Sequence, residues 1–241
     1  VGAALPYNPS YTEPEFEAYF RDMHLSALLT RPAFAPAAER VAARLGIPVL
    51  DLDALGQEMQ GASDHSPPSP DAIAVVLLTS ASTGKPKRVP LSHRNVCTSA
   101  RHVSRSMDLG PGDRCLSMWE LYHIGGLVDL LLAPLDAGGT VITTAGFDGP
   151  RFFDLLERVQ PTWFQGVPTT LGELVLQARR RGIDPRRSSL RLLRSVAAAL
   201  SPALMSEIET LFGVPVLQTF GMTEAGPLIA STALPPAERA A

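Results

Sequence analysis

Residues 73–79 read Ile-Ala-Val-Val-Leu-Leu-Thr, and residues 80–88 continue as Ser-Ala-Ser-Thr-Gly-Lys-Pro-Lys-Arg. The first stretch is a continuous apolar run, which predicts a buried strand. The second is rich in hydroxyls and holds Lys85 and Lys87, the two lysines of a chain in which Lys and Arg together number 21. Backbone N–H groups, hydroxyls and ammonium groups in such a loop can together surround a polyphosphate.

Short apolar runs alternate with amphipathic segments on both sides of this loop. Strands separated by helices in this way predict parallel βαβ crossovers, and hence an α/β fold with mostly parallel sheets. We expect strands at residues 26–30, 47–52, 73–79, 113–119, 140–144, 163–167, 192–196 and 214–219. We expect helices at residues 14–24, 36–45, 92–108, 126–136, 150–159, 169–181 and 202–212, with Ser92 and Ser201 as N-caps. Residues 57–70 are rich in Gly, Ser, Pro and Asp and are predicted to form a loop or linker.

The composition excludes several classes of protein. A hydrophobic fraction of 45% is enough for a packed core, and a net charge of −3 argues against a general nucleic-acid-binding protein. No apolar run approaches the ~20 residues of a membrane-spanning helix. Cys97 and Cys115 are too few for a disulfide scaffold, so we expect a reducing, cytoplasmic setting.

A second motif, Phe220-Gly221-Met222-Thr223-Glu224, directly follows a predicted strand. Ligands of open α/β sheets bind at the carboxyl ends of the strands. An aromatic face can stack on adenine, a glycine lets the backbone approach a nucleotide, and a hydroxyl can bind a phosphate. The carboxylate supplies an oxygen ligand of the kind that Mg²⁺ prefers. A simple turn that begins a helix is the alternative interpretation.

The lysine-containing loop has two other interpretations. A P-loop requires the pattern G-x-x-x-x-G-K-[ST]. Here Thr79 stands in place of the first glycine, and Pro86 removes an N–H where a helix would receive phosphate. The other alternative is a solvated linker, although this loop directly follows an apolar strand and holds every lysine of the chain.

The two motifs resemble those of the adenylate-forming ligases, the superfamily of acyl-CoA synthetases, luciferases and adenylation domains. The family pattern T-S-G-[ST]-T-G-x-P-K-G is matched at Thr79, Ser80, Ser82, Thr83, Gly84, Pro86 and Lys87. Ala81 and Arg88 replace two glycines of that pattern, which restricts the loop backbone. The family pattern [YF]-G-x-T-E is matched at all four of its specified positions by residues 220–224.

The resemblance extends to two further segments and assigns roles to their residues. Tyr122, His123, Gly126 and Leu127 match the family segment F-H-x-x-G-L, whose histidine flanks the substrate carboxylate. Ala197 and Ala198 stand where the family has a small-residue turn against adenine and the acyl group. The implied catalytic residues are Lys87, His123, Thr223 and Glu224, with Glu224 as the Mg²⁺ ligand. The implied nucleotide-binding residues are Thr79, Ser80, Ser82, Thr83, Gly84, Lys85, Ala197, Ala198, Phe220, Gly221 and Met222.

The resemblance implies activation of a carboxylic acid by ATP to an acyl-adenylate, followed by transfer to the thiol of CoA or a carrier-bound phosphopantetheine. Residues 1–241 resemble part of an N-terminal adenylation domain. We find no T-G-D segment and no lid domain with its lysine, so we expect weak or no turnover by the chain alone. The alternative is a catalytically incomplete nucleotide-binding or docking domain of a multidomain synthase.

The acid is not identified, although no acidic residue is obviously placed to hold an α-ammonium group. His93, Cys97 and His102 have a loosely zinc-like spacing, but a zinc site needs three or four convergent ligands. The arginines at 179–181 and 186–187 are interpreted as a solvated helix end, with contact to an acyl carrier protein as the alternative.

Overall fold

The computed structural model describes residues 2–58, 66–79 and 86–235. The chain divides into two compact units, Tyr7–Pro68 and a larger one made of Val1–Pro6 and Ser69–Ala241. The boundary between Pro68 and Ser69 lies within the predicted linker, residues 57–70.

The smaller unit packs three helices around a short parallel pair of strands. Its elements are α1 (Glu13–Met23), β1 (Leu28–Thr30), α2 (Pro36–Leu45), β2 (Val49–Asp51) and α3 (Leu52–Glu58). Aromatic rings of α1 and small residues of α2 form its core, including Phe16, Phe20, Val41 and Ala42. The sequence did not predict α3, because Leu52 was assigned to a strand. The Asp51 side chain accepts a hydrogen bond from the backbone N–H of Asp53 at 2.9 Å, which favours a turn there.

The larger unit begins with the hairpin β3 (Ile73–Thr79) and β4 (Lys87–Ser92), followed by α4 (His93–Ser106). The chain continues through β5 (Arg114–Ser117), the π-helix η1 (Gly125–Leu132), α5 (Ala133–Asp136), β6 (Thr140–Thr143), α6 (Gly149–Val159), β7 (Trp163–Gly166) and α7 (Pro168–Arg181). It then forms η2 (Pro185–Arg187), β8 (Leu192–Ser195), α8 (Pro202–Phe212), β9 (Val216–Phe220), η3 (Thr223–Ala225) and β10 (Ala230–Ser231).

Six of these strands form a sheet in the order β10-β9-β8-β7-β5-β6. All neighbours are parallel except β10, which pairs antiparallel with β9. The predicted α/β fold with a mostly parallel sheet is therefore confirmed. The caps predicted at Ser92 and Ser201 are also confirmed, since these side chains accept hydrogen bonds from the N–H groups of Asn95 and Leu204.

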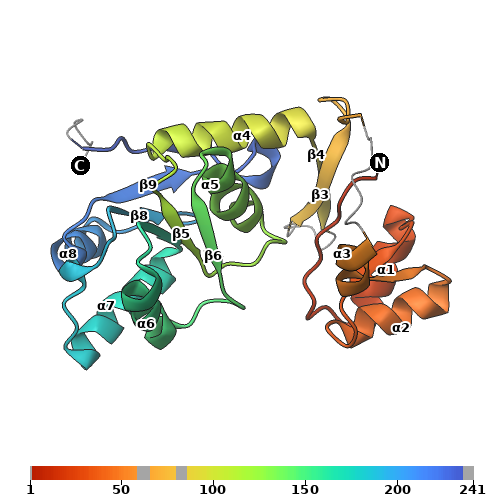
Figure 1. Ribbon diagram of the computed structural model, residues 1–241, viewed down its shortest axis with the longest axis horizontal. Helices are drawn as coiled ribbons and strands as arrows, with labels where there is room; N and C mark the ends of the chain where they lie inside the picture. Colours follow the sequence, from red (N-terminus) through yellow and green to blue (C-terminus); the bar gives the residue numbers. More distant parts are fainter. Residues whose placement is uncertain (1, 59–65, 80–85, 236–241) are drawn as a thin grey trace. The chain divides into compact units, whose positions relative to one another are not determined.

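Successive residues of the parallel strands point to opposite faces of the sheet, and both faces are covered. Leu116, Phe164 and Leu193 pack against α6, α7 and α8, whereas their neighbours Cys115, Trp163 and Leu192 pack on the face that carries α4, η1 and α5. Figure 1 shows these two helical layers on either side of the sheet. This arrangement leaves the carboxyl ends of the strands as the place for a ligand.

The strand β4 was not predicted, because no strand was expected between the lysine-containing loop and the helix at residues 92–108. Val89 and Leu91 are buried and alternate with exposed residues, and β4 pairs with β3 so that Lys87 lies opposite Thr79. Pro90, which has no N–H to donate, is disfavoured inside a strand but is tolerated in a two-stranded sheet. Thr79 and Lys87, which flank the lysine-containing segment, therefore belong to two paired strands.

The helix expected at residues 126–136 is a π-helix followed by one α-helical turn. The N–H of Ala133 donates to the carbonyl of Val128, five residues earlier. Pro134 has no N–H and cannot donate the next hydrogen bond along the helix, and the hydrogen-bonding pattern changes from π-helical to α-helical there. Within the described part of the chain, no helix is long and apolar enough to cross a membrane.

Candidate functional site

A cavity of about 480 Å³ lies where the strands β5, β8 and β9 end. Eight of the residues predicted to be catalytic or nucleotide-binding line it: Thr79, Lys87, His123, Ala197, Gly221, Met222, Thr223 and Glu224. The remaining lining residues include Trp119, Tyr122, Ile124, Gly125, Asp129, Val196, Thr219 and Pro227. The structure thus brings together segments about 140 residues apart in the chain.

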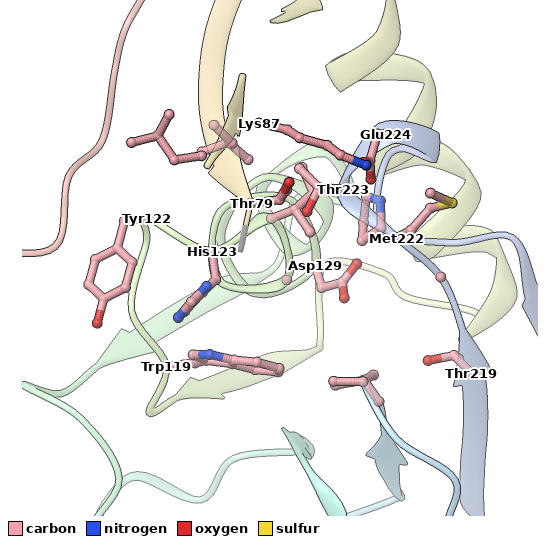
Figure 2. Close-up of a pocket in the computed structure, with 18 residues that line it drawn as sticks. Thr79, Lys87, Trp119, Tyr122, His123, Asp129, Thr219, Met222, Thr223 and Glu224 are labelled. Carbon is pink, nitrogen blue, oxygen red and sulfur yellow. The ribbon is translucent and has the colours of Figure 1, made fainter. Parts of the chain in front are cut away.

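One end of the cavity carries the polar groups of the two motifs. Figure 2 shows the Lys87 side chain extending toward Glu224, with Thr79 and Thr223 beside them. Lys87 is on β4 and Glu224 is on η3, and these two elements are in contact. A cation, two hydroxyls and a carboxylate at one end of a cavity can bind a phosphate chain and its counter-ion.

The central residues of the predicted phosphate loop, Ser80, Ser82, Thr83, Gly84 and Lys85, lie outside the described residues. The residues that flank this loop are described. Thr79 ends β3 and Lys87 begins β4, and the two are paired across the hairpin. Both flanking side chains line the cavity.

The segment 221–227 makes a tight turn after β9. A Cβ atom on Gly221 would overlap the carbonyl oxygen of Pro227, so this close approach requires a glycine. The N–H of Ile229 donates to the carbonyl of Phe220 at 2.9 Å and closes the turn. Met222 and Thr223 line the cavity, whereas Phe220 is 66% exposed and is not among the lining residues. The stacking of Phe220 on adenine therefore stays a prediction.

The small-residue turn after β8 contributes one of its two predicted residues. Ala197 has φ of +67° and lines the cavity. A non-glycine residue in this left-handed region is uncommon and is often found at functional sites. Ala198 is exposed and is not a lining residue. Small side chains at this turn leave the adjoining part of the cavity open.

The cavity wall opposite Lys87 and Glu224 is aromatic. Figure 2 shows Trp119, Tyr122 and His123 together on this side. The His123 ring lies 4.6 Å from the Tyr122 ring and 6.3 Å from the Trp119 ring, measured between centroids. Burial, with a smaller effect of Glu120, raises the pKa of Tyr122, so its hydroxyl stays a neutral donor. A Cβ on Gly126 would overlap the Glu120 carbonyl oxygen, which explains the glycine at this turn.

The sequence did not single out Asp129 or the two side chains that contact it, Gln165 and Arg194. Asp129 lines the cavity from η1, and its Oδ2 lies 2.9 Å from Arg194 Nη1. The Gln165 amide donates to Asp129 Oδ2 at 3.1 Å, and Arg194 Nη1 donates to Gln165 Oε1 at 2.6 Å. Burial raises the pKa of Asp129, and Arg194 and Gln165 oppose that shift. The available sequence signal was a lone acidic residue in the apolar run Gly-Gly-Leu-Val-Asp-Leu-Leu-Leu.

Other candidates lie outside this cavity. Over residues 2–58, 66–79 and 86–235, no group of three or more His, Cys, Asp or Glu side chains could hold a metal ion, and this includes His93, Cys97 and His102. Three of the arginines in the two basic clusters form ion pairs. Arg179 pairs with Glu207, Arg181 with Asp154 and Arg186 with Asp184.

A parallel sheet covered on both faces, with a polar and aromatic cavity at its carboxyl edge, defines an α/β ligand-binding protein. A sequence profile described as AMP-binding enzyme matches residues 1–241. The chain belongs to this family, the adenylate-forming ligases that its motifs resemble.

Curated relatives in the family are named as CoA ligases. The probable CoA ligase CCL9 of Humulus lupulus is 32% identical over 96% of this chain and 47% of its own length. The sulfoacetate–CoA ligase of Cupriavidus necator is 36% identical over 95% of this chain and 42% of its own length. Among solved structures, ATP-bound MatB from Rhodopseudomonas palustris has a TM-score of 0.84 and 27% identity, covering 98% of this chain and 48% of MatB. The chain thus spans about half the length of the relatives it matches.

Proposed function

We propose that this protein activates a carboxylic acid with ATP, forming an acyl-adenylate and pyrophosphate, and then transfers the acyl group to a thiol with release of AMP. One observation carries the proposal. Lys87, Thr79, Thr223 and Glu224 gather at one end of the cavity, and His123 and Trp119 lie on the wall opposite. The polar end suits the phosphates of ATP, and the aromatic wall suits the acid.

The family relatives support this assignment. The matched relatives are named as CoA ligases, and the MatB structure contains ATP. CoA is therefore the acceptor that we favour, with a carrier-bound phosphopantetheine as the alternative. A carrier protein as partner, and the cytoplasm as the protein's location, stay predictions.

The first step joins two anions, so its barrier is mainly electrostatic. A carboxylate oxygen of the acid attacks the α-phosphorus of ATP, a new P–O bond forms, and the bond to the bridging oxygen breaks to release pyrophosphate. Lys87 and Thr79 would bind the leaving pyrophosphate, and Thr223 would orient the α-phosphate. His123 would hold the attacking carboxylate. The protein thus acts by positioning and by charge stabilisation.

Glu224 fits a magnesium ion that arrives with the nucleotide. Mg²⁺ is commonly bound through one or two carboxylates, phosphate oxygens and water, so a dedicated cluster of protein ligands is not needed. Glu224 is exposed on the cavity wall beside Thr223. When bound there, the ion would offset the negative charge of the phosphates.

The test measures MgATP binding calorimetrically and acid-dependent pyrophosphate release for the wild type and Glu224→Ala. We expect Glu224→Ala to weaken MgATP binding at least tenfold and to abolish pyrophosphate release. Glu157→Gln is the matched control, because this exposed carboxylate of α6 lies outside the cavity lining. It should leave both measurements unchanged.

Two results would contradict the proposal. One is wild-type protein that binds no MgATP. The other is binding that is equally strong with and without the Glu224 carboxylate. Because weak or no turnover is expected of residues 1–241 alone, pyrophosphate release is measured on the full-length protein. There, binding of MgATP with no pyrophosphate release for any acid would favour the nucleotide-binding or docking domain over the ligase.

A further inference from the structure

A buried polar network reaches the cavity wall at Asp129. Asp129, Gln165 and Arg194 are all buried. Arg194 Nη1 lies 2.9 Å from Asp129 Oδ2 and donates to Gln165 Oε1 at 2.6 Å. Figure 2 shows Asp129 extending from the turn of η1 toward β9, the strand that carries Thr219. Asp129 is the member of the network that lines the cavity.

Stability alone does not account for this network. Removing two charges from water costs several kcal/mol per ion, and apolar replacements of buried ion pairs are often as stable or more stable. The π-helical geometry of η1, which presents Asp129, is itself frequent at functional sites. The network therefore calls for a role in ligand recognition.

One oxygen of Asp129 is left over. Asp129 Oδ2 accepts a hydrogen bond from Gln165 and forms the ion pair with Arg194. The buried Oδ1 has no hydrogen-bond partner among the described residues. A buried acceptor without a donor is costly. Because Asp129 lines the cavity, a donor on a bound acid can reach this carboxylate. A trapped water molecule is the competing explanation.

The surroundings define what kind of donor fits. Arg194 balances the charge of Asp129, so an ammonium group would bring an uncompensated positive charge into a buried place. A second carboxylate would face Asp129 and be repelled. Trp119 and Ile124 make the adjoining wall apolar. A Cβ on Gly125 would lie 3.5 Å from Trp119 and 3.6 Å from Asp129 Oδ2, so the glycine keeps the space beside the carboxylate open.

We propose that Asp129, held by Arg194 and Gln165, is a specificity-determining residue that selects acids bearing a hydroxyl group at the buried end of the acyl chain. This inference rests on the proposed function and narrows its substrate class. The hydroxyl donates to Asp129 Oδ1, and the apolar part of the acyl chain packs on Trp119 and Ile124.

The experiment uses stable acyl-adenylate analogues, N-acylsulfamoyl adenosines, whose binding is measured by calorimetry. Each short acyl chain is made unsubstituted and with a hydroxyl at successive carbon atoms. The terminal position is also made as an amine and as a carboxylate. For the best hydroxyl position we expect about tenfold tighter binding than for the unsubstituted chain.

Two variants connect the preference to the network. Asp129→Leu combined with Arg194→Met removes the acceptor without leaving a buried unpaired charge, and it should bring the hydroxyl preference below about twofold. Gly125→Ala keeps the ion pair and adds a methyl group beside Asp129, and it should weaken binding of the hydroxylated probe more than the unsubstituted one. MgATP binding and circular dichroism check that each variant is folded.

Three results would overturn the inference. The first is equal binding of hydroxylated and unsubstituted probes by the wild type, which a retained water would give. The second is tighter binding of the amine or carboxylate probe. The third is a hydroxyl preference that survives in the folded double variant. In each case the adenosine probes still bind, so the proposed function stands. Failure of MgATP and of every probe to bind would overturn the proposed function and this inference together.

Discussion

Arg194 and Asp129 form an ion pair of 2.9 Å in which both side chains are almost fully buried, 1% and 3% exposed. Arg194 comes from β8 and Asp129 from the π-helix η1, so the pair links the parallel sheet to a segment that covers it. The consequences of breaking this pair differ from those of replacing it.

Removing one charge of this pair should destabilise the folded protein much more than removing both. We expect Arg194→Met to lower the free energy of unfolding by about 3–5 kcal/mol, because it leaves the Asp129 carboxylate buried and unpaired. Asp129→Leu with Arg194→Met should recover most of that loss. Urea unfolding of the three proteins measures the difference. A single variant as stable as the double variant would contradict the ion-pair assignment.

The stability loss in Arg194→Met should depend on pH in a defined direction. Burial raises the pKa of Asp129 above its ordinary 3.8, so the folded state binds the proton more readily than the unfolded state. The stability that Asp129 contributes therefore falls as pH rises from about 4 toward the folded pKa. Without Arg194 this effect grows, and the deficit of Arg194→Met should be smaller at pH 5 than at pH 8.

Asp113 should show the opposite pH dependence. Burial by itself raises the pKa of Asp113, but hydrogen bonds from Arg191, Thr162 and the N–H of Gly110 together lower it below its ordinary 3.8. Arg191 Nε lies 2.6 Å from the carboxylate. The resulting stability is present above the unfolded pKa and is lost as pH falls through the folded pKa. We expect Asp113→Asn to cost about 1.5–3 kcal/mol at pH 7.

Urea unfolding of the wild type and Asp113→Asn at a series of pH values tests this. The gap between the two should close as the pH falls below about 4. Asp154→Asn is the control, because its ion pair with Arg181 is solvent-exposed and such pairs contribute about 0–1 kcal/mol. A gap that is constant with pH would show that Asp113 does not titrate as described.

Lys87 should matter for nucleotide binding and not for folding. Its side chain lines the cavity at the end that carries Glu224, and it is exposed to solvent. We expect Lys87→Ala to weaken MgATP binding by about 10–100-fold, the value of one charged hydrogen bond, with unchanged unfolding. Arg158→Ala, an exposed cation of α6, is the matched control. Equal affinities for Lys87→Ala and wild type would remove Lys87 from the site.

Two glycines should respond oppositely to alanine. In Gly221→Ala the added methyl group would overlap the Pro227 carbonyl, so the turn that forms the cavity wall must open. In Gly172→Ala the nearest atom is Leu204 Cδ2 at 3.8 Å, and the residue lies inside α7. We expect Gly221→Ala to lose at least ~1 kcal/mol of stability together with MgATP affinity, and Gly172→Ala to gain ~0.5–1 kcal/mol. Thermal unfolding with and without MgATP measures both effects. An unchanged melting temperature for Gly221→Ala, or a lower one for Gly172→Ala, would contradict the prediction.

The two thiols should differ in reactivity. Cys97 is exposed on α4, whereas Cys115 is completely buried in β5. Burial, with a smaller effect of Asp129, raises the pKa of the Cys115 thiol and so disfavours the reactive thiolate. A disulfide reagent should label one thiol in the folded protein and a second only after unfolding. The fast reaction should disappear in Cys97→Ser, and its persistence there would mean that Cys115 is accessible.

Much of the fold and one end of the site could be predicted from the amino-acid sequence, because both depend on local patterns. Apolar periodicity sets where strands and helices form, as in Ile73–Thr79 and Pro202–Phe212, whose predicted bounds match the structure. The motif residues Lys87, Thr223 and Glu224 are recognisable because their residue types and spacing carry the chemistry.

The tertiary structure decided what depends on contacts between distant segments. Only pairing with β3 makes a strand of Lys87–Ser92, since a proline is disfavoured inside strands. Only packing brings Asp129, Gln165 and Arg194 within hydrogen-bonding distance, although 36 and 29 residues separate Asp129 from Gln165 and Gln165 from Arg194. A single acidic residue in an apolar run does not name its partner. The charge that balances it, and the oxygen that remains for a ligand, are defined by the folded chain.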